Sequence, residues 1–176
     1  MLKRLLMLVL MVAPLSLCAQ KFAHFDYASI IQAMPEYKKA QTDLEALGKQ
    51  YQSELENMQK ELQTKAEQYQ KSDAAANTPQ NMKDRHNTEL QELYQRLQQA
   101  QQDNSEAFQK AQQDKIQPIS QKVMDAVNDI AKAGGYVYII DKNAAQTAGI
   151  VINESLSTDV TSQVKSKLGI SAAATK

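Results

Sequence analysis

The stretch "LEALGKQYQSELENMQKELQTKAEQY", residues 44–69, decides the fold of this chain. Its apolar side chains return at steps of three or four, so that Leu44, Leu55 and Ala66 occupy equivalent positions. Such an 11-residue repeat has about 3.67 residues per turn and predicts a long helix that is straight or supercoils slightly to the right. A lone helix with one thin apolar stripe is not stable in water, so it needs a partner.

The partner follows in the same chain. The helical pattern runs from residue 36 to residue 72 and breaks at "SDAAANTPQN", residues 72–81. Thr78 is the expected N-cap and Pro79 the expected first residue of a second helix, which should end at the pair Gly134 and Gly135. Two long amphipathic helices joined by a short break predict an antiparallel hairpin over residues 36–117, with its tip near residues 72–81.

Folding the chain about residue 75 or 76 predicts the register of this hairpin. The expected neighbours are Leu90 with Leu62, Leu97 with Glu54 or Leu55, and Ala107 with Leu44.

Two prolines stand at the expected base of the hairpin. Pro35 suits the first turn of the first helix, and Pro118 lies inside the second helix, where it removes a hydrogen bond. They are candidates for a hinge, and the alternative is a simple change of direction at that point.

The rest of the chain predicts a small β-rich body, residues 20–35 and 118–170. Strands are expected at residues 21–27, 136–140 and 149–152. Asp26 should cap a short helix, and Thr161 should cap another that ends at Gly169. Three short strands cannot bury enough surface alone, so we expect copies of the body to associate. The candidate residues for this contact are Phe22, Phe25, Val137, Ile139, Ile150 and Ile152.

The first 19 residues have the pattern of a secretory signal. Lys3 and Arg4 precede a short apolar run, and small residues lead to Ala19, where cleavage is expected. The alternatives are lipidation at Cys18 and an uncleaved anchor. Cleavage leaves a chain without cysteine and with two more acidic than basic side chains, in a compartment without ATP. Residues 171–176 are expected to form a disordered tail.

Motifs for catalysis, metal binding and cofactor binding are not evident. The histidines are His24 and His86, and neither has a partner at metal-ligand spacing. We expect both to be structural, and we expect no catalytic residue, no metal and no cofactor. The zero formal charge gives no indication of nucleic-acid binding.

The glutamine-rich stretch "YQRLQQAQQDNSEAFQKAQQDK", residues 94–115, is expected to be the weakly packed middle of the hairpin. Large aromatic and methionine side chains on the hairpin have two interpretations. They either pack between the helices or offer adaptable contacts to an unfolded chain. The candidates for such distributed contacts are Tyr51, Met58, Tyr69, Tyr94 and Phe108.

Three segments carry a resemblance to a known family: "KFAHFDYASIIQAMPEYKKAQ" from residue 21, "GGYVYIIDKNAA" from residue 134 and "STDVTSQVKSKL" from residue 157. Together with the long insertion between them, they resemble the Skp/OmpH family of periplasmic chaperones. The resemblance implies a mainly helical α+β fold in which three chains form a small β body and project helical hairpins around a cavity. It implies an ATP-independent holdase, without a cofactor, whose partners are unfolded outer-membrane β-barrel proteins and two copies of itself.

One departure from that family concerns charge. Many members are strongly basic, whereas residues 36–117 hold 11 Lys or Arg against 14 Asp or Glu. No basic site for clients or lipopolysaccharide is therefore transferred, and transient contact with a membrane stays open. The alternative function is a structural or adaptor protein of the cell envelope that docks through the hairpin tip, residues 74–82.

Overall fold

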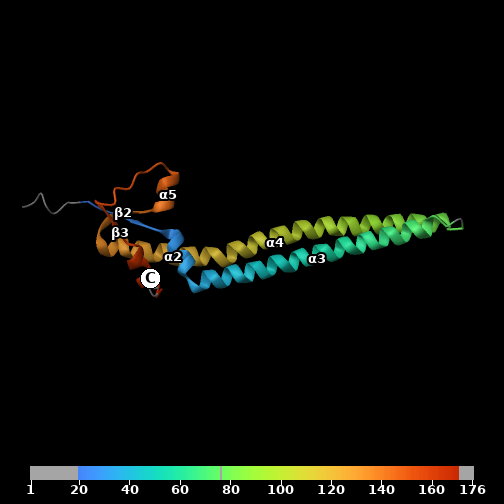
Figure 1. Ribbon diagram of the computed structural model, residues 1–176, viewed down its shortest axis with the longest axis horizontal. Coiled ribbons are helices and arrows are strands. Elements are labelled where there is room, and N and C mark those ends of the chain that lie inside the picture. Colours follow the sequence, from blue (N-terminus) through green and yellow to red (C-terminus); the bar gives the residue numbers. More distant parts are fainter. Residues whose placement is uncertain (1–19, 76, 171–176) are drawn as a thin grey trace, which may run out of the picture. The chain divides into compact units, whose positions relative to one another are not determined.

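The structure, a computed structural model, describes residues 20–75 and 77–170 (Figure 1). The expected signal, with Cys18 and Ala19, and the expected tail, residues 171–176, lie outside the described residues. The chain forms two compact units, which we describe separately. One unit, which we call the arm, is Pro35–Pro118; the other, which we call the body, joins the residues up to Met34 with those from Ile119 onward.

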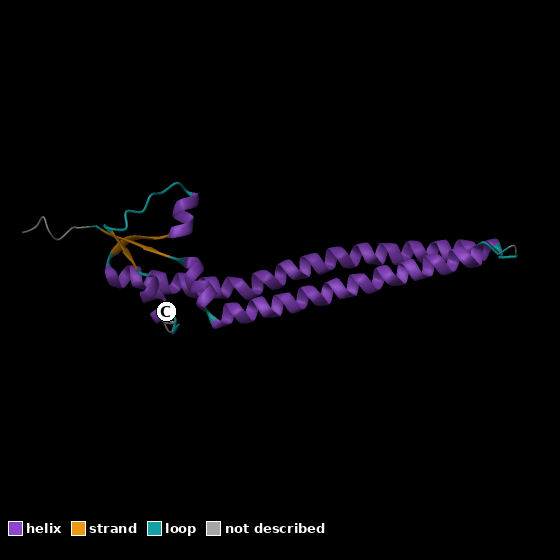
Figure 2. Cartoon of the chain, in the orientation of Figure 1, coloured by secondary structure: helices purple, strands orange, loops and turns teal. Residues whose placement is uncertain are grey.

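The arm is a helical hairpin. Helix α3 spans Pro35–Asp73 and helix α4 spans Gln80–Gly134, and in Figure 2 they are the two long purple helices. Helix-favouring residues fill both, and Gly48 is the only glycine inside α3. The predicted class, a mainly helical α+β fold with a long antiparallel hairpin and a small sheet, is confirmed.

The turn between the two helices differs from the prediction. The first residue of α4 is Gln80, one residue after the expected Pro79. The Thr78 hydroxyl, expected to cap α4, donates a hydrogen bond of 2.6 Å to the Ser72 carbonyl. Thr78 therefore closes the turn onto the end of α3, and the Pro79 carbonyl accepts from the Met82 backbone N–H.

The predicted register of the hairpin is wrong by more than one helical turn. Asn104, rather than Leu97, reaches Glu54, with 3.4 Å between Nδ2 and Oε2. Phe108 lies against Gly48, whereas its neighbour Ala107 was predicted to lie beside Leu44, about one turn further along α3. The chain turns nearer residue 78 than residue 75, because α3 continues through Asp73 before the turn begins.

The body contains a parallel three-stranded sheet in the order β2-β1-β3. The central strand, β1, is Lys21–Phe25, and its neighbours are β2, Tyr136–Asp141, and β3, Ser157–Asp159. β1 ends before the predicted Tyr27, because Asp26 is already the N-cap of the next helix.

The predicted third strand at residues 149–152 is wrong. Gly149, at φ 70°, ends a helix, and the Ile150 N–H donates back to the Ala145 carbonyl, so these residues form a loop. The strand is instead Ser157–Asp159, a polar triplet with no apolar alternation that could have revealed it. Its pairing with β1, Phe22–His24, sets its conformation.

Three short helices complete the body: α2 at Tyr27–Ala33, α5 at Lys142–Thr147 and α6 at Thr161–Lys167. The Asp26 side chain accepts from the Ser29 N–H at 2.8 Å, which confirms the predicted cap. Thr161, expected to cap α6, is its first residue, and the N-cap position, Val160, makes no side-chain capping bond. The buried core of the body includes Phe25, Ile30, Ile31, Met34, Val123, Val160 and Val164.

Within the described ranges, 20–75 and 77–170, no helix has the length and apolar character needed to cross a membrane.

Candidate functional surfaces

The five arm residues predicted to contact an unfolded chain occupy different environments. Tyr94 is 52% exposed, whereas Tyr51, Met58, Tyr69 and Phe108 are half-buried. Of the four half-buried residues, Phe108 contacts the facing helix at Gly48, and Tyr69 contacts it at His86.

Phe108 packs into a notch on the facing helix. A Cβ placed on Gly48 would lie 3.6 Å from the Phe108 Cε2 atom, so the ring covers the position where Gly48 has no side chain. Phe108 thus supports the pairing of α3 and α4 in a region of the seam otherwise filled by small residues, Ala100 and Ala111.

A shallow polar groove runs beside Met58. The residues that line it come from both helices: Gln50, Ser53, Glu54, Asn57, Met58, Arg96 and Ala100. A second groove, nearer the tip, shares Arg96 with the first and includes Leu93, Glu61 and Glu92. Both grooves are lined mostly by polar and charged side chains, with Met58 and Ala100 as the apolar members of the first and Leu93 of the second.

The distal part of the arm contains a cluster of polar and aromatic side chains, which we call the distal clamp: Lys65, Tyr69, Asp73, His86 and Glu89. Both the Lys65 ammonium and the Tyr69 hydroxyl donate to the Glu89 carboxylate. The His86 Nδ1 lies 2.8 Å from the Asp73 Oδ1, and the His86 ring stacks on Tyr69 with centroids 3.9 Å apart. His86 is 9% exposed and has a structural role here, as expected.

Charge pairing within the distal clamp shifts two pKa values. The hydrogen bond from Lys65, helped by that from Tyr69, holds the pKa of the Glu89 carboxyl below its ordinary 4.5. The same bond with Glu89 raises the pKa of the Lys65 ammonium above its ordinary 10.5. Both groups therefore stay charged in the folded arm at neutral pH.

The body exposes a group of large apolar side chains around one hollow. A pocket of about 270 Å³ is lined by residues of β1, β2 and the loop before β3: Phe22, Ala23, Tyr138, Ile140, Ile150, Val151, Ile152, Asn153, Leu156 and Ser157. The Phe22 and Tyr138 rings stack with centroids 6.3 Å apart. Val151 is 93% exposed and Leu156 is 79% exposed, which is unusual for such side chains in an isolated chain.

The predicted association residues divide between this surface and the interior. Phe22, Val137 and Ile150 are each more than 40% exposed, Ile139 and Ile152 are half-buried, and Phe25 is 3% exposed and belongs to the core. The prediction omitted Tyr138, Val151 and Leu156. The neighbours Val137 and Tyr138 are both exposed, so Tyr136–Asp141 has no alternation that could have revealed Tyr138. Nothing in the sequence indicates that the loop turns Val151 and Leu156 outward.

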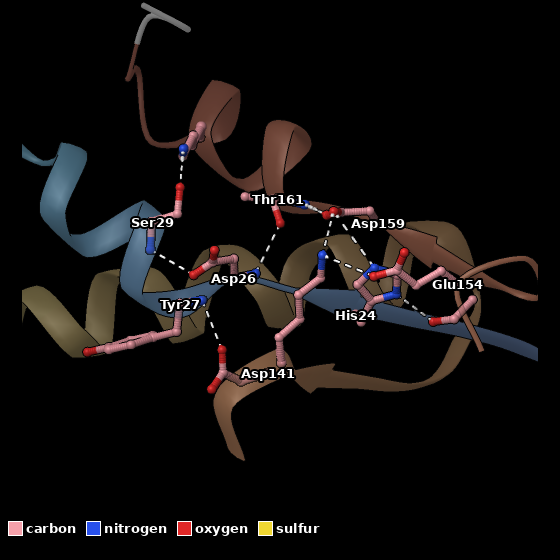
Figure 3. A network of polar contacts seen from close by, with 11 residues as sticks. His24, Asp26, Tyr27, Ser29, Asp141, Glu154, Asp159 and Thr161 are labelled. Carbon is pink, nitrogen blue, oxygen red and sulfur yellow. Dashed lines mark hydrogen bonds and ion pairs between the residues drawn. The ribbon is translucent and has the colours of Figure 1, made fainter. Parts of the chain in front are cut away.

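A network of polar contacts joins the ends of the three strands (Figure 3). His24, in the central strand and 2% exposed, has its Nδ1 2.8 Å from the Ser157 hydroxyl. Its Nε2 lies 3.7 Å from the Asp159 carboxylate, beyond hydrogen-bond range. Lys142 adds ion pairs to Asp159 and Glu154, at 3.4 and 3.7 Å. These contacts attach the short polar strand β3 to the rest of the body.

An aspartate ends each parallel strand and accepts from the backbone that follows. The Asp141 carboxylate accepts both the Tyr27 N–H and the Ala144 N–H, each at 2.9 Å. Asp159 accepts from the Thr161 N–H at 2.9 Å, and the Thr161 hydroxyl accepts from the Asp26 N–H at 3.0 Å. Partial burial acts to raise the pKa of Asp159, but the hydrogen bonds at Thr161 and the charge of Lys142 hold it below the ordinary 3.8.

The part of the chain that the structure describes has no group of three or more His, Cys, Asp or Glu side chains that could hold a metal ion. The polar clusters of the arm and the body are built from mutually satisfied donors and acceptors, which makes them structural supports for the surfaces around them.

The fold defines a class of proteins in which a long helical hairpin is inserted into a small sheet. A crystal structure of an OmpH-like protein from Caulobacter crescentus CB15, to which an outer-membrane chaperone role has been ascribed, matches with a TM-score of 0.68 and 15% identity. The match covers 85% of this chain and 83% of that chain, and at this identity it shows the fold. No curated protein matches the sequence.

The model of one protein family, outer membrane protein (OmpH-like), matches residues 21–168. Because this range includes nearly all of the described residues, the chain belongs to the OmpH-like family, as the sequence resemblance predicted. The family is in general one of periplasmic outer-membrane chaperones and not of enzymes.

Proposed function

We propose that this protein is an ATP-independent holdase of the periplasm that binds unfolded outer-membrane β-barrel proteins and prevents their aggregation. The observation that carries the proposal is the arm, in which α3 and the part of α4 up to Pro118 meet along a thin seam and leave aromatic and methionine side chains partly exposed. A rod of this kind presents a large surface but little enclosed volume. It suits many weak contacts and does not suit one tight site.

Self-association supplies the enclosure that a single arm lacks. The exposed apolar side chains around the body pocket, among them Val151 and Leu156, favour burial against further copies of the chain. We propose a homotrimer, the state implied by the family, in which the bodies associate through this surface. Several arms around one client convert weak contacts into avid holding by raising the effective concentration of each.

The experiment that tests the holdase function needs no nucleotide. A urea-unfolded outer-membrane β-barrel protein is diluted into buffer with and without the purified protein, and light scattering follows aggregation while native mass spectrometry weighs the complex. We expect suppression of aggregation without ATP and a complex of one client with one small oligomer. Unchanged aggregation at excess protein would refute the proposal.

Distributed binding predicts a modest effect of any one arm residue. Replacing the exposed Tyr94 by Ala should lower client retention by less than about tenfold, since one side chain contributes about 1 kcal/mol to such contacts and 1.4 kcal/mol corresponds to tenfold. The matched control is Gln95→Ala, on the neighbouring exposed position of α4. Complete loss of retention in Tyr94→Ala, with helix content unchanged by circular dichroism, would contradict distributed binding.

A further inference from the structure

The apolar seam of the arm does not determine how its two helices are aligned. On α3 the pattern repeats every 11 residues, so that Leu44, Leu55 and Ala66 are interchangeable. On the facing part of α4 the seam holds the small or polar side chains Ala100, Asn104 and Ala111, with Leu97 and Phe108 as its large apolar members. Sliding one helix past the other therefore exchanges one set of similar contacts for another, at small cost.

A second register would also pair large apolar side chains along the seam. It places Leu90 beside Leu62 and Leu97 beside Leu55, which are large apolar pairs. The same shift places Asn104 beside Gly48, His86 beside Ala66 and Glu89 beside Gln63. The shifted register would replace the contact of Phe108 with Gly48 by other contacts, and it would lose the polar contacts of the distal clamp.

The distal clamp is the part of the arm that distinguishes the two registers most strongly. The Glu89 carboxylate accepts hydrogen bonds from both Lys65 and Tyr69. His86 pairs with Asp73, and the His86 ring stacks on Tyr69 at an interplanar angle of 6°. The exposed fraction of the side chain is 11% for His86, 24% for Asp73, 33% for Lys65 and 42% for Glu89. The shifted register would separate the nearly buried His86 ring from the Asp73 carboxylate, and a buried polar group that loses its partner is costly.

Other polar contacts between the helices are weaker discriminators. Asn104 and Glu54 are 3.4 Å apart and exposed to solvent. Lys115 and Asp43 are 2.9 Å apart, and their side chains, 38% and 41% exposed, form a single ion pair that contributes little. Lys65 and Glu89 are similarly exposed, but they lie beside the more enclosed pair of His86 and Asp73.

We propose that the distal clamp sets the register between α3 and α4 along the whole arm. The seam stabilises the pairing of the two helices but does not select their register. A buried polar group that specifies register at some cost in stability is an established device of coiled coils. Here the clamp lies next to the turn, at Asp73 and His86. It therefore fixes the pairing of the helices where the chain reverses, and this pairing sets the register of the rest of the arm.

Disulfide trapping tests this alignment in the full chain, with Cys18 replaced by Ser. The pair Glu54→Cys and Asn104→Cys reports the observed register, and the pair Gly48→Cys and Asn104→Cys reports the shifted one. Glu54 and Gly48 lie about 9 Å apart along α3 at about 1.5 Å per residue, so one alignment cannot serve both pairs. With the clamp intact, we expect the first pair to oxidise and the second to stay reduced.

Removing the clamp charges with apolar replacements, Lys65→Met, His86→Leu and Glu89→Met, should keep the arm helical, because such exchanges are often neutral for stability. We then expect the shifted-register pair to oxidise to a yield comparable with the first pair. The control is Glu45→Met with Lys49→Met, which removes an exposed ion pair within α3 and should leave the first pair as the sole product. A helical clamp-free arm that still traps only the observed register would overturn the proposal.

A charge reversal keeps the test decisive if the triple variant unfolds. Lys65→Glu alone places two carboxylates, at positions 65 and 89, against each other in the observed register. We expect this repulsion to allow trapping of the shifted register. Adding Glu89→Lys restores an opposite-charge pair and should restore trapping of the observed register only. If Lys65→Glu traps only the observed register, or if the double reversal fails to restore it, the clamp does not set the alignment.

Discussion

Asp141 shows how a single carboxylate connects distant parts of the chain. One oxygen accepts the N–H of Tyr27, the first residue of α2, and the other accepts the N–H of Ala144, in the first turn of α5. The segment "YVYIID" therefore ends in a residue that caps its own following helix and the start of another. The sequence predicted the local cap of Asp26, but it could not predict the bond to Tyr27, which lies 114 residues away.

Replacing Asp141 by Ala should destabilise the body by about 2 kcal/mol, because two helical N–H groups lose their acceptor and a cap alone contributes about 1 kcal/mol. Asp141→Asn keeps one acceptor oxygen and should lose about half as much. Urea unfolding followed by circular dichroism measures both variants. Equal stability of Asp141→Ala and the unmodified protein would contradict the capping role.

Replacing Gly48 by Ala should stabilise the arm. Glycine inside a helix costs roughly 1 kcal/mol relative to alanine, and the new Cβ would make an ordinary contact of 3.6 Å with Phe108. We expect the free energy of unfolding to rise by about 1 kcal/mol, measured by thermal denaturation. A matched comparison is Gly134→Ala, where the new Cβ would lie 2.3 Å from the Tyr136 ring and should destabilise the protein unless that ring moves.

At the scale of elements, the long helices could be predicted and the smallest strand could not. Apolar residues that recur at steps of three and four over more than thirty residues, followed by a glycine at position 134, predict a helix and no other element. β3 consists of Ser157, Thr158 and Asp159, which carry no apolar alternation. Its conformation comes from pairing with β1 and from the His24 bond to Ser157, and both are tertiary contacts.

The glutamine-rich part of α4 should be the less stable half of that helix. Over residues 94–115 the side chains facing α3 are small or polar except for Leu97 and Phe108, whereas residues 121–130 include the buried Val123, Ala126 and Val127. Amide hydrogen exchange should be faster over residues 94–115 than over residues 121–130. Equal protection of the two segments would indicate a uniformly stiff helix.

Acid should weaken the arm through its carboxylates. Hydrogen bonds from Lys65 and Lys115 hold the pKa values of Glu89 and Asp43 below their ordinary 4.5 and 3.8. Because the folded pKa is the lower one, the stabilisation is complete above these ordinary values and is lost as the pH falls through the folded pKa. Arm unfolding measured from pH 6 down to pH 3 should show stability decreasing below about pH 4.5.

That decrease should be smaller in Glu89→Gln, which has no proton to gain. A variant at the exposed Glu67, Glu67→Gln, provides the control with the same chemical change. If Glu89→Gln and the unmodified protein lose stability in parallel, the carboxylate of Glu89 is not the group responsible.

At the scale of the whole molecule, the sequence predicted two kinds of structure and their order along the chain, but not their internal alignment. The hairpin and the small sheet followed from periodicity and breaks. The register of the hairpin did not, since an 11-residue repeat offers several similar alignments, and tertiary contacts such as His86 with Asp73 and Phe108 with Gly48 distinguish them. The client-contact and association roles of individual residues remain predictions.

Association of the bodies should depend on the apolar loop before β3. Val151→Asp places a charge on a side chain that is 93% exposed in the single chain, so the fold of one copy should not change. Sedimentation velocity should show a smaller oligomer or a monomer. Gln146→Asp, on an exposed position of α5, is the control and should keep the native oligomer. An unchanged oligomer in Val151→Asp would exclude this loop from the interface.

The parallel sheet has a consequence for the order in which the chain folds. Its central strand, β1, precedes the arm in the chain, and both strands that pair with it, β2 and β3, follow the entire arm. The hairpin can close from neighbouring segments, but β1 has no strand to pair with until residues 136–159 reach it. The body should therefore form later than the arm.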